Sequence, residues 1–151
     1  MKKYISLLFQ TSAVLIGISA FAFLLFEPHI EGRNVNATLF EIYSRDPFLA
    51  YAYIASIPFF VILYKAFKVS EYMTQPTIDI PKSIQALKTI IYCAIATIGF
   101  VMIGESIIVL SNDSDDIAGG VFMGFLVILF SVATITTTMI AKRSLRKKGS
   151  H

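Results

Sequence analysis

Four long apolar stretches, separated by short polar segments, form the pattern of this chain. They cover about residues 4–26, 49–67, 89–110 and 117–141. Each is about as long as a helix that crosses the hydrocarbon of a bilayer, which needs about 20 mostly apolar residues. The pattern therefore predicts an all-α integral membrane protein, a bundle of four transmembrane helices that forms one domain over residues 1–148.

The composition supports the membrane class. Hydrophobic residues make up 56% of the 151 residues, charged residues only 15%, and the mean hydropathy is +0.71. The basic start "MKKYISLLFQ" raises the alternative of a signal peptide, and "ISAFA" at 18–22 is an imperfect cleavage-like run. The apolar stretch is longer than a signal core of about 7–15 residues, which favours a retained helix. The closing residues 149–151 resemble an expression-tag remnant.

The charges divide unequally between the two ends of the spans. Eleven of the 13 Lys and Arg residues fall on the side of both termini, and the other two, Arg33 and Arg45, fall on the opposite side. Positive residues favour the cytoplasmic side of a membrane, so both termini are predicted to be cytoplasmic. We therefore attribute the net charge of +3 to the basic residues that orient the protein in the membrane, and we expect no nucleic-acid partner. A lipid-headgroup role for the basic "AKRSLRKK" segment remains an alternative.

The loop between the first two spans carries helix-start signals. Thr38 and Glu41 form the T-x-x-E pattern of a capping box, which predicts a short extracytoplasmic helix over about residues 39–44. Asp46 is placed to cap the second span, and Pro47 to occupy its first turn. We expect these four residues to give the loop a folded structure, an outer cap.

Prolines and tyrosines suggest how the helices begin, bend and end. Pro28 is expected to end the first helix, Pro58 to kink the second, and Pro81 to start a helix that continues into the third span. Tyr51 and Tyr53 lie near the end of a span, where aromatic residues often meet the bilayer interface.

Small residues predict close helix contacts. Ala13 and Gly17 lie on one face of the first span, and Gly120 and Gly124 form a G-x-x-x-G pair in the fourth. Such residues let helix backbones approach closely in a membrane. Packing within one chain, contact between copies in a homo-oligomer, and a polar solute path all remain open for the second pair.

Glu105 is the acidic residue embedded in a predicted span. Ionising a carboxyl group in hydrocarbon is costly, so it should find a partner, contact water or bind a proton. We expect it to bond to the outer cap, through Arg33, Arg45 or nearby hydroxyl groups. Proton or cation coupling at Glu105 is the alternative.

Signals for other chemistry are weak. The acids and His29 around the outer loop could meet at a metal ion, but H-x-E is not a diagnostic zinc spacing, and we expect no metal site. Cys93 is the single cysteine, which does not favour a disulfide relay. The sequence has no Walker loop, dinucleotide fingerprint or nucleophile elbow. We therefore expect no catalytic residues, no cofactor and no enzyme activity.

The segment "EPHIEGRNVNATLFEIYSRDPFLAYAYIASIPFFVILYKAFK" resembles the domain-of-unknown-function 2975 family of small bacterial membrane proteins. The resemblance covers about the first three spans. It implies an integral protein of the bacterial cytoplasmic membrane with no established activity, and it supplies no catalytic residues.

The expected function is therefore a noncatalytic interaction or regulatory role in the bilayer, with another membrane protein or a second copy as partner. The competing hypothesis is a small oligomeric carrier or channel that couples protons or cations through Glu105. A dry, grooved flank would favour the first hypothesis, and a water path to Glu105 would favour the second.

Overall fold

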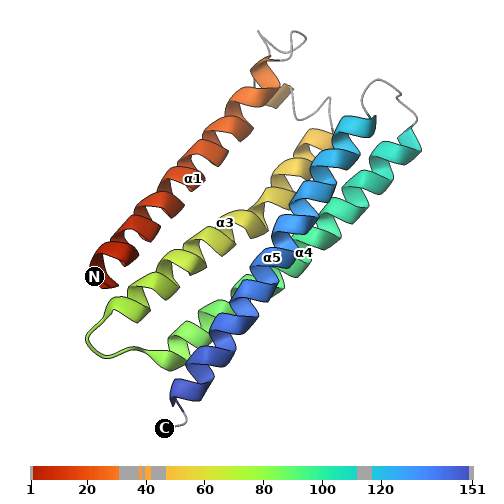
Figure 1. Cartoon of the computed structure of the whole chain (residues 1–151). Helices are drawn as coiled ribbons and strands as arrows, with labels where there is room; N and C mark the ends of the chain where they lie inside the picture. The colour runs from red at the N-terminus through yellow and green to blue at the C-terminus, as the bar shows by residue number, and fades with distance from the viewer. Residues whose placement is uncertain (1, 31–37, 39, 42–46, 112–116, 150–151) are drawn as a thin grey trace.

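The computed structural model describes residues 2–30, 38, 40–41, 47–111 and 117–149. In this part of the chain, the fold is all helical (Figure 1). The long helices are α1 (Lys2–Ile30), α3 (Pro47–Thr74), α4 (Ile80–Ser111) and α5 (Ile117–Gly149). All four are long and apolar enough to cross a membrane. The prediction of an all-α protein with four candidate membrane spans is confirmed.

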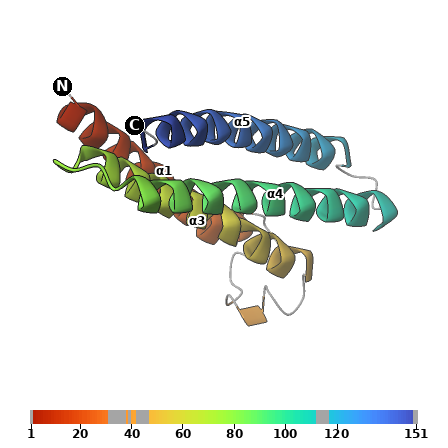
Figure 2. The ribbon, with the colours of Figure 1, turned by 90° about the horizontal axis from the view of Figure 1, so that it is seen from below.

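The helices form an open row. Among the described residues, the main contacts join α1 to α3, α3 to α4, and α4 to α5. Figure 2 shows α5 and α3 on opposite sides of α4 along much of its length. The sequence predicts a bundle but not this order, which leaves α1 and α5 as the two ends of the row.

One end of the row carries both chain termini and the connection between α3 and α4 (Figure 1). We call it the basic end, because the basic segment of α5, including Arg146, Lys147 and Lys148, lies there. The buried hydrophobic core is also near this end. It consists of Leu87, Ile90 and Leu145, with partly buried Ile62, Ala66, Val69, Ile84 and Ala141 packed against it. This core holds α3, α4 and α5 together.

The start of α4 is fixed by a cap at the basic end. Asp79 precedes the helix, and its Oδ1 accepts a hydrogen bond from the Lys82 backbone N–H at 3.1 Å. The fully buried Ser83 donates its hydroxyl to the Asp79 carbonyl at 2.8 Å. Pro81 lies in the first turn, where no amide donor is needed. The expected helix start at Pro81 is confirmed, and α4 continues from there through the third apolar stretch.

This cap predicts a pH dependence. The side-chain and backbone hydrogen bonds from Lys82 lower the pKa of Asp79 below its ordinary value. A carboxyl group with a lowered folded-state pKa stabilises the fold above its unfolded pKa, and that stabilisation is lost as the pH falls through the folded pKa. We therefore expect the melting temperature of the purified protein to decrease when the pH is lowered beneath about 4.

Asp79→Asn keeps an oxygen for the cap but has no titrating carboxyl group. Its melting temperature should be lower than that of wild type at pH 7, and the difference should shrink toward pH 3. A difference that stays constant between pH 7 and pH 3 would contradict the role of the Asp79 carboxylate.

The expectation that Pro28 ends the first helix is wrong, because α1 continues through Pro28 to Ile30. A proline within a helix leaves the carbonyl four residues earlier without its usual N–H partner. For Pro28 this is the Leu24 carbonyl, which accepts a hydrogen bond from the Tyr53 hydroxyl of α3. The neighbouring helix therefore supplies the donor that Pro28 lacks. Pro58 also lies within a continuous helix, α3.

Candidate functional site

The hydrogen bonds of the capping box are present in the outer loop. The backbone N–H and hydroxyl of Thr38 both donate to Glu41 Oε2 at 3.0 Å. The Glu41 N–H donates in return to Thr38 Oγ1 at 3.4 Å. Most of the short helix predicted there, and Asp46, lie outside the described residues. Pro47 is the first residue of α3.

Glu105 of α4 packs against Gly124 of α5. A Cβ atom added at Gly124 would lie 2.8 Å from Glu105 Cδ and 3.1 Å from Cγ, closer than real Cβ contacts allow. A Cβ at Gly120 would lie 3.3 Å from Ile108 Cδ1, also on α4. The G-x-x-x-G pair thus faces α4 within one chain, and the missing side chain of Gly124 provides the space that the Glu105 carboxyl group occupies.

One oxygen of the Glu105 carboxyl group is buried in the contact between α4 and α5. This oxygen, Oε1, has no hydrogen-bond partner among the described residues. Arg33 and Arg45, the partners expected from the sequence, lie outside the described residues. A buried oxygen that accepts no hydrogen bond is costly to the fold. This chemistry keeps the coupling hypothesis open.

Tyr51 links α3 to α4, on the side of α4 away from α5. Its hydroxyl donates to the Phe100 carbonyl at 2.5 Å, and its ring meets the Phe100 ring edge-on with centroids 5.9 Å apart. A Cβ at Gly104 would lie 3.2 Å from Tyr51 Cε1, so the glycine allows this close approach. Tyr51 and Tyr53 were expected to anchor the bilayer interface. In the structure, both hydroxyl groups donate to carbonyls of neighbouring helices.

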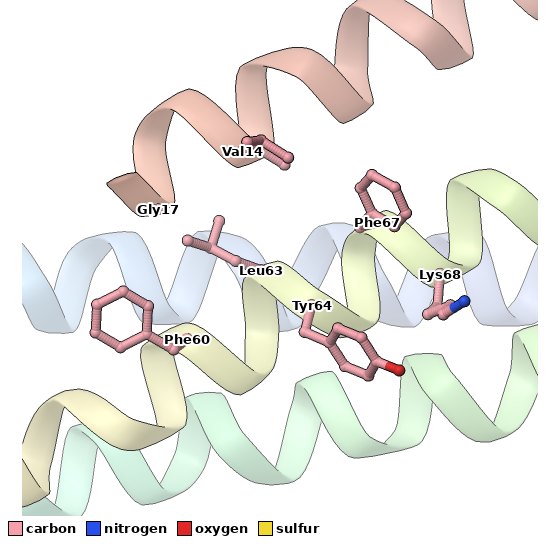
Figure 3. Close-up of a pocket in the computed structure, with 8 residues that line it drawn as sticks. Val14, Gly17, Phe60, Leu63, Tyr64, Phe67 and Lys68 are labelled. Atoms are coloured by element: carbon pink, nitrogen blue, oxygen red, sulfur yellow. The ribbon is translucent and has the colours of Figure 1, made fainter. Parts of the chain in front are cut away.

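A groove lies between α1 and α3, with a volume of about 430 Å³ (Figure 3). Val14 and Gly17 of α1 face α3 across it, and Phe60, Leu63 and Phe67 line it from α3. Ala13 of α1 also lines it and is buried. A Cβ at Gly17 would lie 3.6 Å from Leu63 Cδ1, an ordinary contact distance. The small residues of α1 therefore form one wall of an apolar groove.

A larger cavity of about 540 Å³ lies at the basic end and is lined by residues of all four long helices. We call it the basic-end cavity. Its wall includes Ile5 and Phe9 of α1, Met73 of α3, and Thr137 of α5, with Lys148 as its charged lining residue. Sequence analysis missed it, because these residues are far apart along the chain and become neighbours only when the helices pack.

Three hydroxyl groups line the same cavity and join α1 to α3. Ser6 Oγ and Ser70 Oγ share a hydrogen bond of 2.6 Å, and Thr74 Oγ1 donates to Ser6 Oγ at 2.7 Å. Thr74 Oγ1 also lies 2.6 Å from the Ser70 carbonyl. Serine and threonine in apolar helices were a weak signal for this cluster, but the sequence does not tell which hydroxyl groups meet.

For a metal centre, the described residues contain no group of three or more His, Cys, Asp or Glu side chains placed to hold an ion. Cys93 is a free thiol in α4. Glu31 and Asp46 of the outer loop, and the side chain of His29, lie outside the described residues.

Four candidate spans, interhelix contacts made by small residues, and short connections define a small multi-span integral membrane protein. The chain belongs to the family described as "Protein of unknown function (DUF2975)", so the family inferred from the sequence is confirmed. The match covers residues 34–151, which include the second to fourth spans, whereas the resemblance was expected over about the first three. It is 29% identical over 150 residues to "Uncharacterized membrane protein YoaS" of Bacillus subtilis (strain 168), covering 97% of this chain and 92% of that relative. No solved structure matches.

Proposed function

We propose that the protein is a noncatalytic interaction or regulatory component of the bacterial cytoplasmic membrane, and that the groove between α1 and α3 receives a transmembrane helix of a partner protein. The observation that carries this proposal is the groove itself, which is apolar along Val14, Phe60, Leu63 and Phe67. Because the row of helices is open, α1 and α3 keep this groove at a flank of the molecule.

The chemistry of the groove suits a helix. Association of helices in a bilayer depends on close van der Waals packing and on interhelical hydrogen bonds, since lipid tails are as apolar as the helices. Ala13 and Gly17 have small side chains that let a second helix approach α1 closely, and the aromatic rings of Phe60 and Phe67 provide contact area. Lys68, at the edge of the groove, is held by Glu71 at 2.9 Å.

Photo-crosslinking tests this proposal. A benzophenone amino acid is placed at Phe67, which lines the groove, and at Phe130, which is exposed on α5 and serves as a matched control. In native membranes, the Phe67 probe should give one discrete protein adduct that the Phe130 probe does not give. Val14→Trp, which fills the groove, should abolish that adduct. A second copy of this chain as the adduct would identify a homo-oligomer, and equal adducts from both probes would refute the groove.

The topology proposed with this function has both termini and the connection between α3 and α4 in the cytoplasm, as the basic asymmetry indicates. On a Cys93→Ser background, a cysteine at Gln75 should react with an impermeant thiol reagent only after permeabilisation. A cysteine at Asn34 should react in intact cells. Reversed accessibility of these two positions would overturn the orientation.

A second candidate function is a proton- or cation-coupled carrier or channel that uses Glu105. The buried Oε1 without a described partner supports it. Glu105→Gln keeps the size of the side chain but cannot ionise, so a carrier should lose flux while it stays folded. The test compares pH-gradient dissipation in liposomes for both proteins, with melting temperatures measured in parallel. We expect neither protein to dissipate the gradient; robust wild-type flux lost in a stable Gln variant would establish the carrier instead.

A further inference from the structure

The basic-end cavity combines a long apolar wall with polar groups. Its wall is formed by Ile5 and Phe9 from α1, Val69 and Met73 from α3, and Leu87 from α4. Its volume of about 540 Å³ lies within the range of about 300–1,000 Å³ that is usual for small-molecule sites. Such a wall suits a flexible hydrocarbon chain, and residues of all four helices are needed to build it.

The polar groups belong to two places in this lining. Ser6, Ser70 and Thr74 form the hydroxyl cluster between α1 and α3, and Lys148 is contributed by the last turn of α5. Hydroxyl groups can reorient their hydrogen bonds toward an anionic oxygen, and an ammonium group attracts one. An anion in the cavity would therefore meet a charged donor at Lys148, and the hydroxyl cluster offers neutral donors elsewhere in the same lining.

Lys148 is held on a packed helix. Leu145, one turn before it, is buried in the core of α3, α4 and α5. On the other side, a Cβ at Gly149 would lie 3.4 Å from Ile80 Cγ2, which shows that the end of α5 approaches the start of α4. The ion pair of Lys68 with Glu71 and that of Lys82 with Asp79 both lie at the basic end, and Lys148 takes part in neither of them.

We infer that the basic-end cavity binds one anionic lipid of the bilayer, with an acyl chain between α1 and α5 and its phosphate at Lys148. Charge complementarity identifies the anionic headgroup, and the apolar wall identifies a lipid rather than a free phosphate. The site would hold a lipid whether or not the groove between α1 and α3 receives a partner helix, so it goes beyond the proposed function.

Native mass spectrometry of the full chain in detergent tests the site, with dioleoyl phosphatidylglycerol and dioleoyl phosphatidylcholine as probes. One phosphatidylglycerol should bind more tightly than phosphatidylcholine, which has the same chains. Lys148→Gln should weaken phosphatidylglycerol binding about fivefold, because it removes the charged donor that contacts the phosphate in the cavity. Lys147→Gln removes the same charge one residue away, outside the cavity lining, and should change binding less than twofold.

A second pair of variants tests the apolar wall. Thr137 lines the cavity and donates to the Ala133 carbonyl at 2.8 Å, whereas Thr136 makes the same kind of bond to Val132 at 2.9 Å but does not line it. Thr137→Phe should therefore reduce binding of the first phosphatidylglycerol at least tenfold, and Thr136→Phe should not. If Thr137→Phe does not fold, the comparison of Lys148→Gln with Lys147→Gln tests the lipid site without it.

Four results would overturn the inference. The first is equal affinity for phosphatidylglycerol and phosphatidylcholine, which would show that the headgroup is not recognised. The second is an equal effect of the two lysine variants, which would show only general attraction to a basic surface. The third is an equal effect of Thr136→Phe and Thr137→Phe in folded proteins, which would place the lipid elsewhere. Displacement of the lipid by glycerol phosphate alone would identify a free phosphate as the occupant and would also overturn it.

Discussion

Gly124→Ala is expected to destabilise the folded protein by about 1–3 kcal/mol, the usual cost of adding atoms to a packed contact. The new methyl group would overlap the side chain of Glu105, which lies in the space that the glycine leaves. The carboxyl group must then move, or α4 and α5 must separate. Unfolding in detergent mixtures, followed by circular dichroism, measures the change.

Gly99→Ala is the matched control, because a Cβ at Gly99 would meet no atom within 4 Å. The same chemical change should leave stability unchanged or raise it slightly, since alanine favours helix more than glycine does. In a Glu105→Ala background, the cost of Gly124→Ala should fall below about 1 kcal/mol, because the overlapping group is gone. An equal cost in both backgrounds would show that Gly124 acts through another contact.

Tyr53→Phe is expected to cost about 1–2 kcal/mol, because the Leu24 carbonyl loses the donor that replaces the missing N–H of Pro28. No water is available in hydrocarbon to take its place. The control is Tyr64→Phe, which removes the same atom from an exposed tyrosine on the same helix and should cost little. Both variants are compared by thermal unfolding in the same detergent.

The link between Tyr53 and Pro28 can be tested separately by a double-mutant cycle. In Pro28→Ala, the new backbone N–H can donate to Leu24, as in an ordinary helix. The cost of Tyr53→Phe should then fall by about 1 kcal/mol. If the two changes were additive, the tyrosine would stabilise the contact of α1 and α3 without serving the proline.

The ends of the helices show where reasoning from hydropathy alone reaches its limit. The apolar stretches predicted spans that end near residues 67 and 141 and begin near residue 89. The helices continue well beyond these points, since α3 reaches Thr74, α4 begins at Ile80 and α5 reaches Gly149. Hydropathy detects where a helix meets hydrocarbon, but a helix continues until a cap or a turn ends it. Asp79 and Pro81 mark such a start for α4.

Glu105 shows the same limit for a candidate site. Its position within a span was evident from the sequence, because one acid interrupts an apolar run. Its neighbour was not, since Gly124 is 19 positions away and its G-x-x-x-G signal is compatible with packing within the chain, with contact between copies and with a polar solute path. The helix pairing decided that Gly124 faces α4 and that the carboxyl group fills its gap.

The sequence by itself determined the membrane class, the four helices, the capping chemistry of Thr38 with Glu41 and the helix start at Pro81, because each depends on apolar length or on residues within one turn. The tertiary structure alone decided the open order α1, α3, α4, α5, the tyrosine links between helices and the basic-end cavity. The physical reason is that four apolar helices gain little from any one hydrophobic pairing in a bilayer. Their arrangement therefore depends on close contacts and single hydrogen bonds between residues that are distant in the chain.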